Sequence, residues 1–161
     1  MTRKWLVLSI AVSVLIALDQ LTKYWVSETI LYGQKIPVID GFLYLTYHHN
    51  PGAAWGILEG RFGFFVVVTL LAMAMFIYLA KDINYRHKKF YSIGVTLLIA
   101  GTIGNFIDRI LYRYVIDFID VYIVTYDFPI FNIADMCLTV GVVLLGIDLL
   151  IFDFKRGEVR G

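Results

Sequence analysis

The stretch FGFFVVVTLLAMAMFIYLA, residues 62–80, decides the class of fold. It contains no charged residue, and about 20 apolar residues are enough for a helix to cross a hydrocarbon core about 30 Å thick. Three further apolar segments of similar length lie at residues 5–26, 90–107 and 130–152. The sequence therefore predicts an integral membrane protein, mainly α, with four transmembrane helices.

The composition supports this class and excludes others. Of the 161 residues, 60% are hydrophobic and 17% are charged, whereas soluble domains carry about 25% charged residues. The net charge of +1 provides no basic surface, so no nucleic-acid partner is expected. Because Cys137 is the single cysteine, neither an intrachain disulfide nor a cysteine metal cluster can form. No repeat or domain boundary is visible, so residues 1–161 are expected to form a single membrane domain.

The positive charges that flank the spans predict the orientation of the chain, because cytoplasmic flanks carry an excess of lysine and arginine. Nine such residues lie on one side, namely Arg3, Lys4, Lys81, Arg86, Lys88, Lys89, Lys155, Arg156 and Arg160. The other side carries three, Lys35, Arg61 and Arg113. We therefore expect both termini in the cytoplasm, the first span retained as an anchor, and outer connections at residues 27–61 and 108–129.

The two outer connections are predicted to contain strands. Residues 42–47 are rich in aromatic and β-favouring side chains, and an Asn50-Pro51-Gly52 turn signal follows them. Residues 115–124 are β-branched and aromatic enough to be extended. The predicted fold is therefore four transmembrane helices with a small strand-containing platform on the outer face.

Four aspartates stand in the apolar stretch VIDFIDVYIVTYDFPIFNIADM, residues 115–136. Asp120 and Asp127 fall in the outer connection, where water is expected to solvate them. Asp117 and Asp135 lie at the outer boundary, one just after the third span and the other just inside the fourth. A short antiparallel connection could bring their carboxyl groups together.

Two carboxyl groups close together at low dielectric constant cannot both ionise, so one keeps its proton while the other remains charged. Such a pair holds a general acid and a general base at once, which is the chemistry of peptide hydrolysis without a metal. The residues alone leave a second interpretation open, in which Asp117 and Asp135 are separate structural aspartates.

Other polar residues gather at the same level of the membrane, and ionisable groups there indicate a functional site. Asp19 and Lys23 are one helical turn apart in the order that favours an ion pair. An interfacial helix end with a snorkelling lysine is the alternative. Asn105, Asp108 and Arg109 share one face at the outer end of the third span.

Glycines and histidines in these segments have simpler interpretations. Gly101 and Gly104 are expected to allow close helix packing. His48 and His49 are adjacent and lack the spacing of a zinc site, so no metal is expected there.

Two other classes of function fit part of this pattern. A small carrier or proton-coupled subunit relays protons through carboxyl groups in the membrane. Such a relay requires acidic groups along the whole depth of the membrane, whereas the acidic groups of this chain gather at the outer face. A purely structural scaffold would leave the convergence of amides and acids on one level unexplained.

Five stretches resemble, in order, the signature of one family: DQLTK at 19–23, NPGAAWG at 50–56, GNFIDR at 104–109, VIDF at 115–118 and FNIAD at 131–135. Together with the four spans, they make the chain similar to bacterial lipoprotein signal peptidase (signal peptidase II). The resemblance implies an aspartyl endopeptidase of the bacterial inner or plasma membrane, with Asp117 and Asp135 as its catalytic pair. It also implies the substrate, a prolipoprotein whose lipobox cysteine carries a diacylglyceryl group. Cleavage just before that cysteine, without a cofactor, is the implied reaction.

The resemblance further suggests substrate-binding or supporting roles for Asp19, Lys23, Asn50, Gly52, Trp55, Gly104, Asn105, Asp108, Arg109, Asn132 and Ala134. Asn105 and Asn132 are expected to bind the substrate backbone or orient the aspartates, and Arg109 to bind a substrate carbonyl or balance their charge. Trp55, where many relatives have phenylalanine, is expected in an amphipathic lid. The small Ala134 is expected to leave room for the peptide. Membrane lipid is the other expected partner, and the chain is expected to be monomeric.

Overall fold

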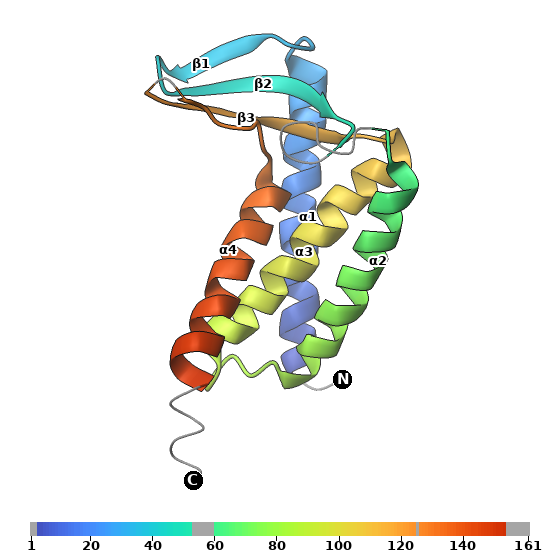
Figure 1. Cartoon of the computed structure of the whole chain (residues 1–161), viewed down its shortest axis with the longest axis vertical. Helices are drawn as coiled ribbons and strands as arrows, with labels where there is room; N and C mark the ends of the chain where they lie inside the picture. Colours follow the sequence, from blue (N-terminus) through green and yellow to red (C-terminus); the bar gives the residue numbers. More distant parts are fainter. Residues whose placement is uncertain (1–2, 53–59, 125, 154–161) are drawn as a thin grey trace.

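In the part of the chain that the structure describes, four helices are long and apolar enough to cross a membrane, and they form the body of the protein (Figure 1). The structure is a computed structural model that describes residues 3–52, 60–124 and 126–153. The helices are α1 (Arg3–Thr29), α2 (Phe62–Leu79), α3 (Lys89–Tyr112) and α4 (Ile133–Ile147). A 3-10 turn, η2 (Ala80–Asp82), extends α2, and a π-helical segment, η3 (Asp148–Asp153), extends α4.

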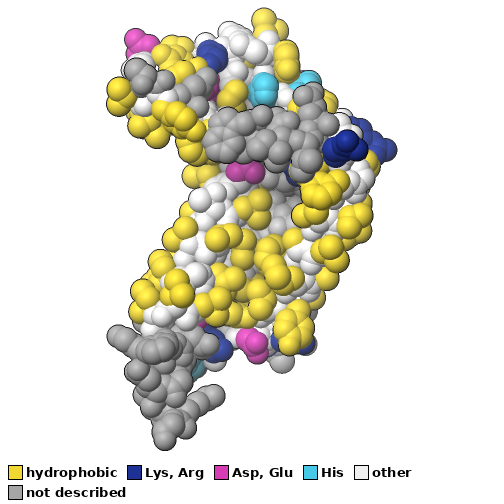
Figure 2. Space-filling model, in the orientation of Figure 1, with side chains coloured by type: hydrophobic (Ala, Val, Ile, Leu, Met, Phe, Trp, Pro, Cys, Tyr) yellow, Lys and Arg dark blue, Asp and Glu magenta, His cyan; other side chains and the backbone are white. Residues whose placement is uncertain are grey.

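Helix α3 is the central element of the bundle. It packs against α1, α2 and α4, and most of its span is buried, whereas 22% or less of the span in each of the other three helices is buried. In the view of Figure 2, hydrophobic side chains cover the bundle and charged side chains lie toward its two ends. This distribution suits a bundle whose sides contact lipid, because lipid offers no partner for charged groups.

Small residues allow α3 to approach its neighbours closely. A Cβ added to Gly101 would overlap the Ala134 carbonyl oxygen, and one added to Gly104 would lie 2.7 Å from a carboxyl oxygen of Asp19. The interpretation of both glycines as packing residues is confirmed. Ala134 is 1% exposed and also packs against Gly104. The small size of Ala134 thus serves the contact between helices, and its role beside a bound peptide stays a prediction.

A small antiparallel sheet lies across one end of the bundle (Figure 1). Its order is β1-β2-β3-β4, with strands β1 (Lys35–Ile39), β2 (Leu43–Asn50), β3 (Val115–Ile123) and β4 (Tyr126–Asp127). Strands β2 and β3 pair so that Asn50 lies opposite Val115 and His48 lies opposite Asp117. The predicted fold class, a mainly α membrane protein with four long apolar helices and a small sheet, is confirmed.

Among the span ends that differ from the prediction, two change where polar residues lie. Helix α3 continues to Tyr112, so Asp108 and Arg109 belong to its last turns rather than to an outer connection. The helix can include these charged residues because the Asp108 carboxylate is buried in an ion pair with Lys23. Helix α4 begins at Ile133 rather than at residue 130, since the Asn132 side chain caps it there.

The close approach at Gly101 predicts the effect of adding one methyl group. Gly101→Ala should lower the thermal unfolding temperature of the purified protein in detergent, because the new Cβ overlaps the backbone of α4. Overpacking of this kind typically costs about 1–3 kcal/mol. Gly146→Ala on α4 is the matched control, since a Cβ there meets no atom of the described residues within 4 Å. Equal unfolding temperatures for the two variants would show that α3 and α4 can move apart without cost.

Candidate active site

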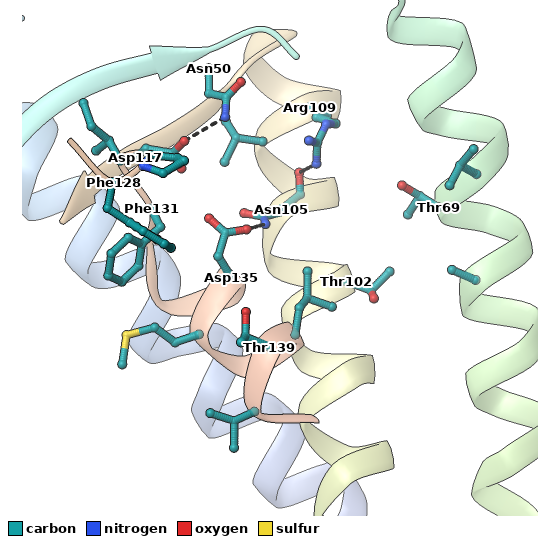
Figure 3. A pocket seen from close by; sticks show the side chains of 18 of the residues that line it. Asn50, Thr69, Thr102, Asn105, Arg109, Asp117, Phe128, Phe131, Asp135 and Thr139 are labelled. Carbon is teal, nitrogen blue, oxygen red and sulfur yellow. Dashed lines mark hydrogen bonds between the residues drawn. The ribbon is translucent and has the colours of Figure 1, made fainter. Parts of the chain in front are cut away.

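Asp117 and Asp135 line the same cavity, which lies beneath the sheet and among the helices (Figure 3). Asp117 comes from β3, and Asp135 comes from the first turn of α4. The cavity has a volume of about 720 Å³ and its walls are mostly apolar. Helices α2 and α4 contribute Val68, Ala72, Phe76, Met136 and Val140 to those walls. The structure thus brings two aspartates from neighbouring boundaries of the chain into one space.

Asn132 connects the two aspartates. Its Nδ2 donates to Asp117 Oδ1 over 2.6 Å, while its Oδ1 accepts from the Asp135 backbone N–H over 2.9 Å. In return, Asp135 Oδ2 accepts from the Asn132 backbone N–H over 3.2 Å. This reciprocal arrangement is the capping box that begins α4. The residue that starts the helix therefore also links the two carboxyl groups.

Two further amides orient the pair. Asn105 Nδ2 donates to Asp135 Oδ1 over 2.7 Å, and Asn50 Nδ2 donates to Asp117 Oδ2 over 2.9 Å (Figure 3). Asn105 comes from α3, and Asn50 is the last residue of β2. Each carboxyl group therefore accepts one hydrogen bond on each of its oxygens, from donors on different elements.

Burial raises the pKa of Asp117 toward neutrality. The residue is 1% exposed, and desolvation, together with the nearby Asp135 carboxyl group, raises the pKa of Asp117 from 3.8 to about 7. Hydrogen bonds from Asn50 and Asn132 and the charge of Lys23 oppose this rise. A carboxyl group with such a pKa can exchange its proton near neutral pH, as a general acid or base must.

A buried ion cluster lies beside the pair. Lys23 Nζ is 2.9 Å from Asp19 Oδ2 and 2.9 Å from Asp108 Oδ2. It also donates to Asn105 Oδ1 over 3.0 Å. The Lys23 side chain is only 2% exposed. The predicted ion pair with Asp19 is therefore confirmed, and the alternative of a snorkelling interfacial lysine is wrong.

The two carboxylates of this cluster hold the backbone next to the pair. Asp108 Oδ2 accepts from the Ile116 N–H over 3.0 Å, and Asp19 Oδ1 accepts from the Ala134 N–H over 2.9 Å. Each of these donors directly precedes one of the two cavity aspartates in the chain. Lys23 thus joins the two anchor points from which those aspartates project.

Gln20 belongs to the same cluster and is missing from the predicted supporting residues. Its Nε2 contacts three acceptors, which are Asp19 Oδ2 at 3.1 Å, Gly104 O at 3.2 Å and Asp108 Oδ1 at 2.9 Å. The signal that could have identified it is an amide between Asp19 and Lys23 in an otherwise apolar span. An amide placed there needs buried partners.

Arg109 crosses from α3 to the chain just beyond β2. Its Nη2 donates to Gly52 O over 3.2 Å, and its Nη1 donates to Asn105 O over 3.4 Å. The guanidinium also lies 4.8 Å from the centre of the Phe65 ring. Because Arg109 lines the cavity, a positive charge borders the space that the two carboxyl groups share. Trp55, the predicted lid residue, lies outside the described residues.

Asp120 is not solvated as predicted. Its side chain is fully buried, and Lys35 Nζ lies 2.7 Å from its Oδ2. The angles at this contact are not those of a hydrogen bond, but at that separation the opposite charges attract whatever the angle. Asp120, together with the Tyr122 hydroxyl that accepts from the same ammonium group, raises the pKa of Lys35. The Asp127 side chain lies outside what the structure describes.

The histidines of β2 take part in ring contacts. His49 stacks on Tyr114 with ring centres 3.8 Å apart, and burial, reinforced by His48, lowers the pKa of His49. Within residues 3–52, 60–124 and 126–153, no three histidine, cysteine, aspartate or glutamate side chains are grouped so as to hold a metal ion.

Comparison with known proteins shows where the chain belongs. The family model described as signal peptidase (SPase) II matches residues 11–151. The chain belongs to the signal peptidase II family. Membership in this family implies a peptidase, and it confirms the resemblance that the five motifs indicate.

Relatives of the chain are similar over most of its length. A Listeria welshimeri protein named lipoprotein signal peptidase is 45% identical over 145 residues, which cover 90% of this chain and 94% of that protein. A protein of the same name from Geobacillus thermodenitrificans is 48% identical over 137 residues, 85% of each chain. Two solved structures described as a bacterial membrane enzyme, obtained by the in meso method, are each 44% identical, with TM-scores of 0.81 and 0.80. The matches cover 89% and 91% of this chain and 87% and 94% of those chains.

The position of Lys23 predicts a large effect on stability. Lys23→Met should strongly lower the thermal unfolding temperature in detergent, because it leaves Asp19 and Asp108 as buried carboxylates without their counter-charge. Breaking a buried ion pair in this way typically costs about 3–5 kcal/mol. Lys81→Met is the matched control, since Lys81 is exposed and lies over the Tyr78 ring. If both variants unfolded at the same temperature, the ion cluster would not be what holds the elements together.

Proposed function

We propose that the chain is an intramembrane aspartyl endopeptidase that removes the signal peptide from diacylglyceryl-modified prolipoproteins, cutting just before the lipid-modified cysteine. Asp117 and Asp135 are its catalytic pair. The observation that carries the proposal is the position of these two carboxyl groups in one largely apolar cavity, where Asn132 bonds to both. The family and the names of the relatives support the substrate class.

The pair starts the reaction with a single proton. The ionised aspartate takes a proton from a water molecule held between the two carboxyl groups, and the resulting hydroxide adds to the carbonyl carbon of the scissile peptide bond. In the same step, the protonated aspartate gives its proton to the carbonyl oxygen. The product is a tetrahedral gem-diol, and the proton of the pair now lies on the other aspartate.

Collapse of the gem-diol completes the cleavage. The leaving nitrogen takes the proton from the protonated aspartate as the C–N bond breaks, and a gem-diol hydroxyl returns a proton to the other carboxylate. The new carboxyl group belongs to the signal peptide, and the new amino group belongs to the lipid-modified cysteine. Every proton transferred comes from the pair or from water, so the reaction requires no cofactor.

The surrounding residues support these steps by fixing the positions of the two carboxyl groups and by stabilising the charge that develops during the reaction. Asn50, Asn105 and Asn132 keep both carboxyl groups in place, so little reorganisation is needed when the proton moves. Arg109 borders the cavity, and its positive charge favours the partial negative charge that develops on the scissile carbonyl oxygen.

The walls of the cavity suit an apolar peptide with attached acyl chains. Side chains from both α2 and α4 line the cavity, and few residues of either helix are buried. A signal peptide that arrives through the bilayer, and the lipid on its cysteine, would meet apolar surface throughout. Membrane lipid is therefore the second partner of the site.

We infer that the active site lies near the outer face of a bacterial cell membrane, with both termini in the cytoplasm. Nine positive charges flank the spans on one side and three on the other. In agreement, α1 begins and η3 ends at the end of the bundle opposite the sheet (Figure 1). One chain supplies every residue of the proposed reaction, so the monomer is the active form.

Asn substitutions test the catalytic pair. Asp117→Asn and Asp135→Asn should each reduce cleavage of a diacylglyceryl prolipoprotein to near background, because an amide can neither carry the charge nor exchange the proton. General acid-base catalysis alone is typically worth about 10²–10⁴ in rate. The double variant should be little worse than either single variant, since residues that act as a unit are not additive. The measurement is the initial rate of purified variants in detergent.

The matched control for these variants is Asp40→Asn. Asp40 is exposed and its carboxyl oxygen accepts from the Tyr44 hydroxyl, at the sheet and outside the cavity. This variant should cleave at the parental rate, and unfolding temperatures should show that all variants are folded. Robust cleavage by either Asp117→Asn or Asp135→Asn would contradict the proposed mechanism.

The pKa of Asp117 predicts how activity depends on pH. The value of kcat/KM should fall as the pH rises above about 7, because the pair then loses the proton it must donate. The value of kcat/KM should also fall at low pH, where both carboxyl groups are protonated. The resulting pH profile is bell-shaped, and its two apparent pKa values describe the coupled pair rather than either residue alone. Asn50→Leu should move the alkaline limb to higher pH, since it removes a hydrogen bond that stabilises ionised Asp117. If the substitution did not shift the alkaline limb, that limb would report the ionisation of a group other than Asp117.

A further inference from the structure

Three threonines line the cavity: Thr69 on α2, Thr102 on α3 and Thr139 on α4 (Figure 3). Thr139 comes one turn after Asp135 along α4, and Thr102 comes one turn before Asn105 along α3. Helix α3 runs toward the sheet and α4 runs away from it (Figure 1). Thr102 therefore lies about 5 Å farther from the sheet than Asn105 along α3, and Thr139 lies farther from it than Asp135 by a similar rise along α4.

The hydroxyls of these threonines differ from those of the other helical threonines. The hydroxyls of Thr22, Thr29 and Thr96 all donate to a carbonyl oxygen of the preceding turn, over 2.8, 2.6 and 2.6 Å. Such bonds are the usual arrangement for threonine in a helix. The three cavity hydroxyls have no hydrogen-bond partner among the described residues. They are available to whatever fills the cavity.

An apolar peptide needs such partners when it is cleaved. A segment that crosses lipid is helical, because lipid offers nothing to backbone N–H and C=O groups. For a scissile carbonyl to reach the carboxyl pair, the residues before it must leave the helix. Their backbone groups would then be unpaired in an apolar cavity, at considerable cost. A threonine hydroxyl both donates and accepts, so it can pair with either kind of backbone group.

We propose that Thr102 and Thr139 form a subsite that binds the backbone of the signal-peptide residues just before the cleaved bond. Thr69 presents a third hydroxyl to the same space from α2. This proposal rests on the proposed peptidase function. It specifies the groups that the subsite recognises, which are the backbone N–H and C=O groups of an unwound apolar segment. Because the subsite binds backbone groups, it can bind apolar signal peptides that differ in their side chains.

The test removes the hydroxyls at nearly constant shape. Thr102→Val and Thr139→Val should each lower kcat/KM for a diacylglyceryl prolipoprotein about three- to tenfold, the range for one lost hydrogen bond. The loss should appear mainly in KM, because the subsite binds substrate and transition state alike. Thr102→Ser and Thr139→Ser keep the hydroxyl and should stay close to the parent. Thr29→Val is the matched control, since its hydroxyl bonds to Trp25 O and lies outside the cavity lining.

A second substrate separates peptide carbonyls from lipid carbonyls. A prolipoprotein with an ether-linked dialkylglyceryl group lacks the lipid esters but keeps the peptide. Similar losses on both substrates support the backbone subsite. A loss confined to the ester-linked substrate, or no loss in the valine variants of a chain that cleaves normally, would overturn the subsite alone. A parent protein that cleaves neither substrate would overturn the peptidase function as well.

Discussion

The buried ammonium group of Lys23 is the contact on which the rest of the structure depends. It lies between the carboxylates of Asp19 and Asp108, and those carboxylates accept backbone N–H groups from α4 and β3 respectively. Burying three charges is costly, and such a cluster is stable only when its remaining hydrogen-bonding capacity is filled. Gln20 and the two backbone donors fill it. One cation therefore connects α1, α3, α4 and the sheet.

The sheet carries one half of the proposed catalytic pair, and a helix carries the other. Asp117 belongs to a strand, whose neighbour β2 ends at a donor to that same carboxyl group. Asp135 belongs to the first turn of α4, and Asn132 is the side chain that bonds to both. A shift of the sheet relative to the bundle would separate the two carboxyl groups. Burial, and to a lesser degree the Asp135 carboxyl group, raises the pKa of Asp117, and perturbed pKa values of this kind concentrate at functional sites.

Much of the fold could be predicted from local sequence. Uncharged apolar segments of spanning length predict the four helices, and β-branched and aromatic runs predict β2 and β3, because hydropathy, length and β-propensity are properties of neighbouring residues. Spacing along one helix also predicts the contact between Asp19 and Lys23, one turn apart. The glycines of α3 could be assigned to packing for a similar reason, since small residues inside a membrane helix have few other uses.

The candidate site needed the tertiary structure, because its contacts join residues that lie far apart in the chain. Asp19 bonds to the backbone of Ala134, 115 positions away, and Gln20 bonds to Asp108, 88 positions away. Periodicity carries no information on such distant contacts, so the sequence does not predict which groups Gln20 contacts. Pairing within the sheet, together with Lys35 beside it, buries Asp120, which local polarity assigned to water. The sequence left open whether the two cavity aspartates meet, since that depends on how strand and helix are anchored to one buried cluster.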